Sequence, residues 1–315
     1  MSSVVFESIE NTYLNSFCFG YRPKIEFNNF YLAFLLRSGG FRKNIIFLAQ
    51  GISRYNISKN AVMNIPIPIP AKEEQEAIGD FFKHLDALLT LHQRKYEKLL
   101  NIKKSMLEKM FPKEGEVVPE IRFKGFTGAW EQRSLGEICV PVQRNDPYSH
   151  APVMMITASS GFIYQSVRYS FDNSGQSLQK YTLLKKGELA YNHGASKLRP
   201  FGSCFALNVK EARIPFVYHS FAVNDDDPEF VSLELNGTNV EKQLRKLVSS
   251  GARMDGLLNI SFDDYGTVTL PLPSIDEQKK ISSFFLKLDS LLTLHQRKLE
   301  MLKNVKQAFL EKMFV

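Results

Sequence analysis

Hydrophobic residues recur at alternating steps of four and three in two long stretches of the chain, and this spacing predicts two long helices. Neither Pro nor Gly interrupts residues 81–111 or 284–314. The spacing is the a/d pattern of a coiled coil, so we expect the two helices to pack together through it. The packing positions are Ile78, Phe82, Leu85, Leu89, His92, Tyr96 and Leu99 in the first stretch, and Ile281, Phe285, Leu288, Leu292, His295, Leu299 and Leu302 in the second.

The two stretches are copies of one another. The octapeptide LLTLHQRK occurs at residues 88–95 and again at 291–298, and with this constant offset of 203 residues 24 of 38 positions are identical across 74–111 and 277–314. Past Leu99 and Leu302 a strict seam would fall on Lys103 and Lys306, and the apolar stripe drifts aside instead. The protein is therefore expected to contain two like units, each ending in the same helix.

His92 and His295 lie on the apolar stripes. Neither has a Cys or carboxylate partner at metal-ligand spacing, so we interpret them as core polar residues that set the helix register, not as metal ligands. The helices themselves have two open interpretations. They either hold the fold together as a hairpin, or serve as a spacer that fixes the distance between two other modules.

A Pro-rich, strand-like run precedes each helix, at residues 65–70 and 270–273. Ser274 with Glu277 predicts a capping box at the second helix. The alignment also matches Ser58 with Ser261, and it places Met1 opposite Cys204, inside the second unit. We therefore expect the first unit to lack the counterpart of roughly 118–202, either through truncation or because another polypeptide supplies it.

The remaining elements follow from turn and alternation signals. Residues 1–64 are expected to be mostly non-helical, with a short helix at 30–36 and a turn carrying two bases at 38–43. Candidate strands are 153–157, 161–165, 188–191 and 203–208, and 241–248 predicts a short amphipathic helix. The fold class is α+β, with antiparallel-sheet-rich domains joined by two long helices that form an antiparallel coiled coil. The expected segments are 1–69, the end of a first domain; 70–112, a helix; 113–133, a linker; 134–272, a complete second domain; and 273–315, a helix.

The composition gives information on the net charge of the protein and on its cellular compartment. The net charge is +7 with a pI near 9.1, which favours a polyanionic partner, nucleic acid before membrane. Cys18, Cys139 and Cys204 form neither a disulfide framework nor a metal motif, which fits a reducing cytoplasm. No apolar run approaches membrane-spanning length, and the N-terminus lacks a signal-peptide pattern.

The sequence contains no convincing catalytic centre. Asn145–Tyr148 (NDPY) faintly resembles a loop of amino-methyltransferases, but no Gly-rich cofactor loop accompanies it. Asp225–Asp227 is more typical of a solvated turn than of a metal site. P-loop, GxSxG and HExxH motifs are absent.

Polar loops with bases are the better candidates for function. Arg and Lys side chains bond guanine edges or phosphates, and Asn can bond adenine, so such loops suit DNA. Each residue can also be an ordinary surface group. The candidate DNA-binding residues are Asn192, His193, Ser196, Lys197 and Arg199 in one loop, Arg253 in a second, and Arg54 and Lys59 in the first unit.

The whole layout resembles the specificity subunit of type I restriction-modification systems. The resemblance rests on the two helices with their Pro-rich approaches, on residues 118–131 (VPEIRFKGFTGAWE), and on the helix starts IDEQKKI and KEEQEAI, each followed by Phe-Phe. It covers nearly the whole chain. The departure from the family is the first recognition domain, of which only the C-terminal part is evident.

The resemblance implies a non-catalytic subunit that recognises a split site in double-stranded DNA. Modification subunits would dock on the helices and supply S-adenosylmethionine-dependent adenine methylation, and restriction subunits would supply ATP- and Mg-dependent translocation and cleavage. No cofactor is expected in this chain. Three other interpretations stay open: a coiled-coil scaffold that binds proteins, an inactive remnant, and a half-size subunit that pairs with a second specificity chain.

Overall fold

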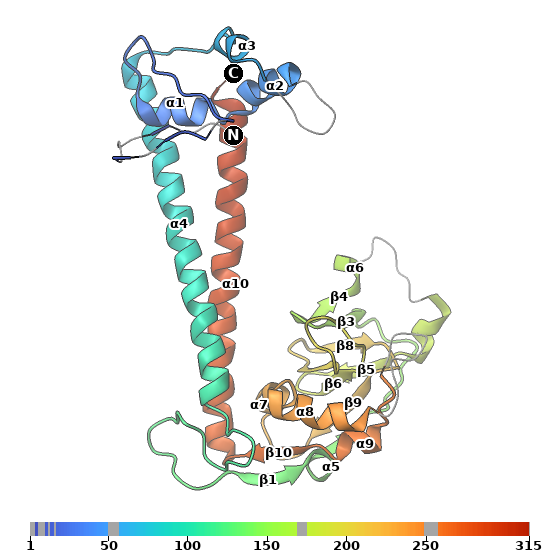
Figure 1. Ribbon diagram of the computed structural model, residues 1–315. Helices are drawn as coiled ribbons and strands as arrows, with labels where there is room; N and C mark the ends of the chain where they lie inside the picture. Colours follow the sequence, from blue (N-terminus) through green and yellow to red (C-terminus); the bar gives the residue numbers. More distant parts are fainter. Residues whose placement is uncertain are drawn as a thin grey trace. The chain divides into compact units, whose positions relative to one another are not determined.

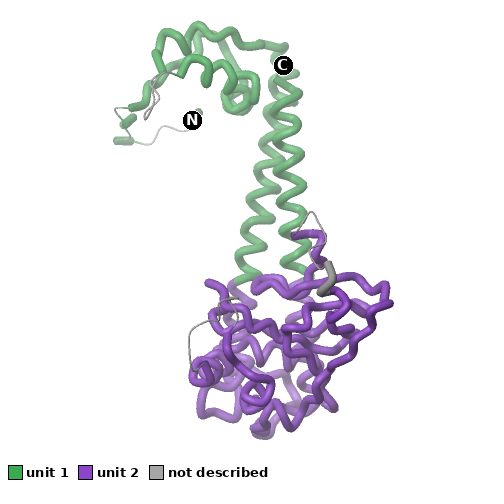
Figure 2. The backbone as a smooth tube through the Cα atoms, turned by 90° about the vertical axis from the view of Figure 1, so that its right-hand side faces the viewer, with its two compact units in different colours: residues 1–100, 290–315 green, residues 101–289 purple. Residues whose placement is uncertain are grey.

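The computed structural model describes residues 4–5, 10–11, 13–15, 17–49, 57–168, 175–248 and 258–314. The chain forms two compact units (Figure 2). Unit 1 contains residues 1–100 and 290–315, and unit 2 contains residues 101–289. Helices α4 (Lys72–Lys109) and α10 (Ile275–Lys312) are the two predicted long helices. Each contributes residues to both units.

In unit 1, α4 and α10 run antiparallel and pack through the predicted seam (Figure 1). Their direction follows from the contacts, since Asp86 pairs with Lys306 and His92 with His295, so numbers rise along one helix as they fall along the other. Phe82 is fully buried, Leu85 and Leu292 are buried, and Leu89 is half-buried. The seam of the coiled coil is therefore confirmed at its predicted positions.

The two lysines that interrupt the strict seam form ion pairs across the hairpin. Lys306 pairs with Asp86 in unit 1, and Lys103 pairs with Asp289 in unit 2. These are the same pair in the two copies of the repeat, and all four residues are half-buried. In unit 2, Phe285 and Leu288 are buried, and the Phe285 ring lies 6.0 Å from that of Phe111. Both ion pairs form in the same register of the two helices.

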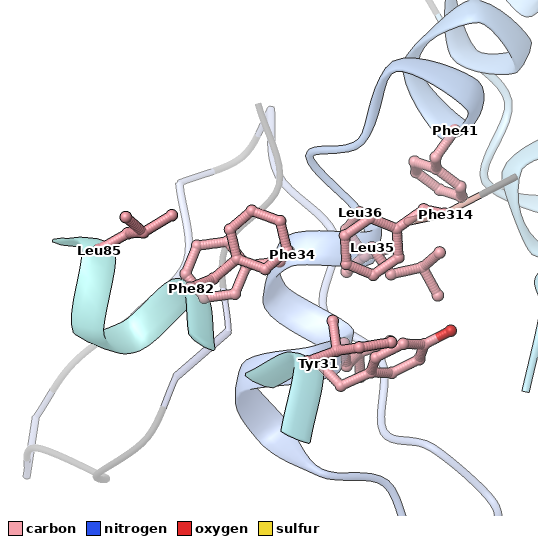
Figure 3. Packing of buried hydrophobic residues seen from close by; sticks show 10 residues of the cluster. Tyr31, Phe34, Leu35, Leu36, Phe41, Phe82, Leu85 and Phe314 are labelled. Carbon is pink, nitrogen blue, oxygen red and sulfur yellow. The ribbon is translucent and has the colours of Figure 1, made fainter. Parts of the chain in front are cut away.

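Three short helices complete unit 1: α1 (Asn29–Leu35), α2 (Gly39–Leu48) and α3 (Lys59–Met63). Helix α1 buries nearly its whole length, and its aromatic residues stack on the hairpin (Figure 3). The Phe34 and Phe82 rings lie 4.8 Å apart, and the Tyr31 ring lies 5.5 Å from that of Phe314. The short helix expected near 30–36 is confirmed.

One expectation for residues 1–64 was wrong. The predicted turn at 38–43 is the start of α2, where the Ser38 side chain accepts from the Phe41 amide. Gly39 and Gly40 allow close packing instead of a turn, since a Cβ on Gly40 would lie 3.3 Å from the Phe314 carbonyl. Helices α1, α2 and α3 cover less than half of the described residues of this segment, which agrees with the expectation of a mostly non-helical segment. Residues 65–70 are extended and form no strand among the described residues.

The described part of unit 2 contains ten short strands in four antiparallel sheets, in agreement with the α+β prediction. The central sheet has the order β2-β9-β6-β7, formed by Cys139–Pro141, His219–Val223, Leu189–Asn192 and Ser203–Ala206. Three strand pairs flank it: β1 (Glu131–Ser134) with β10 (Thr269–Leu272), β3 (Met154–Thr157) with β4 (Gly161–Tyr164), and β5 (Thr182–Lys185) with β8 (Glu211–Ile214). The predicted strands correspond to β3, β4, β6 and β7.

The helices of unit 2 are short. They are α5 (Leu135–Ile138), α6 (Gln165–Arg168), the 3-10 helix η1 (Gly175–Lys180), α7 (Pro228–Leu235), α8 (Thr238–Leu247) and α9 (Phe262–Gly266). Helix α8 includes the predicted amphipathic segment. The Pro-rich run before the second helix is strand β10, and it pairs with β1.

The repeat extends through these helices, because α1, α2 and α3 of unit 1 correspond to α7, α8 and α9 of unit 2. A glutamine fixes the correspondence. The Gln75 side chain accepts from the Asn28 amide at 3.1 Å and donates to the Pro70 carbonyl, and the Gln278 side chain bonds Asp227 and Pro273 in the same way. Asn28 and Asp227 are the N-caps of α1 and α7. Each long helix therefore begins in the same local structure.

The predicted capping box at α10 was wrong, since the Glu277 amide donates to the Ser274 backbone carbonyl and the Glu277 carboxylate bonds another residue. Both carboxylate oxygens of Glu277, which is fully buried, accept from the half-buried Arg122 guanidinium, at 2.6 and 2.7 Å. A charge-assisted bidentate contact of this kind is stronger than a bond to one backbone amide. The second half of the box is therefore replaced by a contact that sequence spacing cannot reveal.

We predict that the hairpin loses stability in mild acid. The Nδ1 atoms of His92 and His295 lie 2.8 Å apart, so one must donate and the other must accept. Burial lowers the pKa of His92, and the charges of His295, Lys298 and Lys95 add to this effect. Because the folded pKa lies below the unfolded value of about 6.5, the unfolded chain binds more protons and stability falls as pH falls through about 6.5.

The measurement is the thermal midpoint of the helical circular dichroism signal between pH 8 and pH 5. We expect the His92→Leu/His295→Leu variant to lose part of the pH dependence. His84, an exposed histidine of the same helix, gives the matched control in His84→Leu. Equal pH dependence in the double variant and the wild type would contradict the prediction.

A second prediction concerns Glu234, a buried carboxyl group in α7 whose Oε1 has no hydrogen-bond partner among the described residues. Burial raises its pKa well above the ordinary value. The folded state therefore binds the extra proton, and this group makes stability fall as pH rises above about 4.3. Counted from the N-caps Asn28 and Asp227, Leu35 occupies the corresponding position of α1. We expect Glu234→Leu to stabilise unit 2 by about 1–3 kcal/mol at neutral pH, since the unpaired polar atom is removed.

Urea denaturation at pH 7.5 and pH 5 tests this prediction. Glu234→Leu should raise the midpoint more at the higher pH, whereas Glu131→Leu, at an exposed glutamate of β1, should not. A lower midpoint for Glu234→Leu at both values would mean that the carboxyl group has a stabilising partner.

Candidate nucleic-acid interface

One end of the central sheet collects the loops that could bind a ligand. Strand register places Tyr191 opposite His219, Asn192 opposite Ser203, and Pro141 opposite Phe221. The loops that follow β2 and β6, and those that precede β9 and β7, therefore leave the sheet at the same end. We call this the loop end of unit 2.

The last residue of β6 and the loop after it hold five of the predicted DNA-binding residues. A tight turn forms its tip, in which the Ser196 amide donates to the Arg199 carbonyl and the Arg199 amide donates to the Ser196 side chain. Ser196, Lys197 and Leu198 are exposed there. Gly202 closes the loop at a φ of +83°, and a Cβ there would lie 2.5 Å from the Asn192 carbonyl. The local structure thus presents Lys197 to solvent.

His193 connects the loops internally. It is buried, with Nδ1 lying 2.8 Å from the Leu258 carbonyl and Nε2 lying 2.8 Å from that of Val217. Its ring stacks on His219 at 4.9 Å. Nε2 of His219 bonds the Ile260 carbonyl, and burial lowers the pKa of His219. Both nitrogens of His193 are thus occupied within the unit, which leaves neither of them for a base edge in this conformation.

Asn192 and Arg199 also make internal contacts. The Asn192 side chain donates to the Ile156 carbonyl and accepts from the Gly194 amide. Nη1 of Arg199 donates to the Asn236 carbonyl at 2.6 Å, and burial lowers the pKa of this guanidinium. Within the loop, Lys197 and Ser196 are the predicted residues that face solvent.

The other candidates lie elsewhere. Lys59 is exposed at the start of α3 in unit 1. Arg54 and Arg253 lie outside the described residues. The chain after the Arg253 loop returns to the loop end, where the Leu258 amide donates to the His193 carbonyl.

The structure adds a cavity of about 530 Å³ at the loop end, which sequence reasoning missed. Arg144 in its wall is held by Glu188 at 2.9 and 3.0 Å, and Asn145 donates to the Gln179 carbonyl. Lys180 and Phe216 are exposed beside it. Its lining combines amide, basic and aromatic groups, which are types that contact nucleotides. The lining residues are Pro141–Asn145, Lys180, Thr182, Phe216, Tyr218–Ser220, Phe262 and Asp263.

No single sequence signal identifies this cavity. Its walls come from segments that are distant in sequence and meet only because β9 pairs with both β2 and β6. The sequence did mark 145–148, although as a poor match to a methyltransferase loop. In the structure the Asn145 side chain donates a hydrogen bond to the Gln179 carbonyl, and Tyr148 is 89% exposed.

The candidate catalytic and metal groups have structural roles where they are described. Asp227 caps α7, and Asp226 accepts from the Gln278 side chain. Burial raises the pKa of Cys139 to about 11 and raises that of Cys204 as well, so neither supplies a thiolate at neutral pH. Among the described residues, no three His, Cys, Asp or Glu side chains are grouped to hold a metal ion.

None of the described helices is both long enough and apolar enough to cross a membrane.

Known proteins with similarity to this chain include type I restriction specificity subunits. Residues 2–101 match the family described as type I restriction modification DNA specificity domain. The chain is 24% identical over 283 residues to the type I restriction enzyme MjaVIII specificity subunit of Methanocaldococcus jannaschii, covering 82% of this chain. It spans 63% of the length of that relative.

A solved structure shares the fold. The type I restriction-modification system S subunit from M. genitalium matches with a TM-score of 0.61 and 17% identity, over 92% of this chain and 73% of that one. The HsdS subunit from Thermoanaerobacter tengcongensis gives a TM-score of 0.48 and 20% identity, over 91% and 70%.

The family match covers the N-terminal part of unit 1 and most of α4, and the curated relative extends the similarity over most of the chain. Both agree with the repeated helix and its approach segment, on which the resemblance was based. The family model and the curated relative therefore agree in the similarity of this chain to type I restriction-modification specificity subunits.

Proposed function

We propose that this chain is the DNA-recognition subunit of a type I restriction-modification complex. The observation that carries the proposal is the match of residues 2–101 to a DNA specificity domain. The net charge of +7 agrees with a polyanionic partner. In this role the chain selects the DNA site at which other subunits act.

The loop end of unit 2 is the proposed contact surface for one half of the site. It presents Lys197 at the tip of an exposed turn and Lys180 beside a polar and aromatic cavity. Lysines suit phosphate contacts, which position the protein, whereas Ser196 and Gln143 offer the groups that bond base edges. Arg253 and Arg54 remain proposed contacts on the sequence argument alone.

The chemistry would belong to partner subunits. Modification subunits, using S-adenosylmethionine, would methylate adenine, and restriction subunits would use ATP and Mg for translocation and cleavage. The chain itself would be non-catalytic. The α4–α10 hairpin is the proposed docking element for these partners, because leucines at 41–46% exposure remain on its outer face at Leu91, Leu100, Leu291 and Leu294.

The alternative of a protein-binding scaffold makes a different prediction. A scaffold has no reason to bind DNA in a salt-dependent manner, whereas a DNA reader loses affinity steeply with salt because phosphate contacts release counterions. Titration of duplex DNA against the assembled complex at several salt concentrations therefore separates the two.

We predict that Lys197→Ala and Lys180→Ala each weaken DNA binding by the complex and lower the slope of log K against log salt by about 1, the value for one phosphate contact. Lys186→Ala is the matched control, since Lys186 is exposed in the turn after β5, whose start at Thr182 borders the cavity. Fluorescence anisotropy with cognate duplex measures both quantities. Unchanged affinity and slope in both variants would place the contact surface elsewhere.

A second prediction concerns specificity. When the chain is co-expressed with its modification subunits, modified adenines across a genome should fall within one sequence motif. Single-molecule sequencing that detects methyladenine gives this motif directly. A stable complex without methylation, or methylation without a common motif, would contradict the proposed recognition role.

A further inference from the structure

The buried ion pair of Arg122 and Glu277 marks a docking surface in unit 2. Glu277 lies in the first turn of α10 and is 0% exposed, and Arg122 belongs to the linker that follows α4. The same guanidinium donates to the Thr127 and Gly128 carbonyls, which folds the linker over the helix. Phe123 adds a second anchor, since its ring lies 6.1 Å from that of Phe284 in an edge-to-face contact.

Unit 1 contains the same helix surface. Glu74 and Phe81 are the repeat copies of Glu277 and Phe284. The start of α4 is held by Gln75 as the start of α10 is held by Gln278, so the first turns have the same surroundings. The two phenylalanine pairs also match, because Phe81 and Phe82 lie 5.4 Å apart at 76° and Phe284 and Phe285 lie 5.3 Å apart at 78°.

The two copies of this surface differ in the residues that cover them. Glu277 is buried by Arg122, whereas Glu74 is exposed and has no ion pair or hydrogen bond among the described residues. Phe81 is half-buried and packs on Phe309, which is itself 40% exposed. A carboxylate and an aromatic edge thus stand at the spacing at which unit 2 receives an arginine and a phenylalanine.

We propose that the Glu74–Phe81 face of unit 1 is a docking site for an Arg-Phe segment of a polypeptide other than a copy of this chain, bound as residues 122–123 are bound in unit 2. Glu74 would accept both guanidinium bonds, and Phe81 would receive the phenylalanine. The chemistry of the occupant is fixed by the unit-2 copy, which shows what this surface binds when it is covered.

One part of the unit-2 contact is not repeated. Lys280 lies over the Phe126 ring at 4.7 Å, and Ala77 occupies the corresponding position in unit 1. The occupant therefore needs the arginine and the first phenylalanine, and gains nothing from a second aromatic residue at the position of Phe126.

The experiment uses the full chain and a fluorescein-labelled synthetic peptide of its own residues 113–131, followed by fluorescence anisotropy without DNA. We expect saturable binding that Glu74→Gln weakens by at least about tenfold, since a desolvated charge pair loses its partner. Glu73→Gln is the matched control, because Glu73 is exposed in the same helical turn. It should bind within about twofold of the wild type.

Substitutions in the peptide test the two anchors. Arg122→Ala and Phe123→Ala peptides should bind weakly, and the Phe126→Ala peptide should bind like the unmodified one. The Glu74→Arg chain should regain affinity for an Arg122→Glu peptide, which a loss through misfolding would not allow.

Two results would overturn the proposal. The first is absence of saturable binding, or equal binding to wild type and Glu74→Gln, which would mean that the peptide binds elsewhere. The second is self-association of the chain, measured by sedimentation without peptide, that Glu74→Gln abolishes. A second copy would then be the occupant. None of these outcomes depends on DNA recognition, so the proposed function can stand or fall separately.

Discussion

The antiparallel register of α4 and α10 is the constraint on which the rest of the structure depends. An apolar seam alone tolerates shifts by whole heptads, but Lys103 with Asp289 and Lys306 with Asp86 pair together in one register. Each half-buried lysine would lose its partner if the helices slid. The seam breaks at the lysines because charge pairs, and not apolar contacts, fix the alignment there.

The repeat shows how one local sequence adapts to two surroundings. Gln75 and Gln278 make the same two hydrogen bonds at the start of each long helix. Yet Glu277 is buried under Arg122, whereas Glu74 faces solvent. Leu35 and Glu234 make the reverse point, since matched buried positions hold an apolar group in one unit and an unpaired carboxyl group in the other.

In unit 2, buried polar side chains organise a surface without belonging to it. His193 and His219 stack and bond three separate backbone carbonyls, which holds the loops of one sheet end together. Such groups are satisfied inside the unit, and this releases exposed residues such as Lys197 for contact with a ligand. A polar loop therefore divides into residues that build it and residues that can bind.

The sequence by itself determined the long helices, their seam, the repeat and the family resemblance, because these depend on local periodicity and on identity between two stretches of one chain. It also located α1, several strands and the loop that holds Lys197. Only tertiary structure decided the sheet order, the cavity around Phe216, and the inward direction of His193 and Arg199. These depend on pairing between distant segments, and a side chain's hydrogen-bond partner cannot be deduced from its neighbours in sequence. Gly39 and Gly40 are a further example. Their sequence is typical of a turn, but in the structure they begin a helix that packs closely on its neighbours and buries Phe41 in the core.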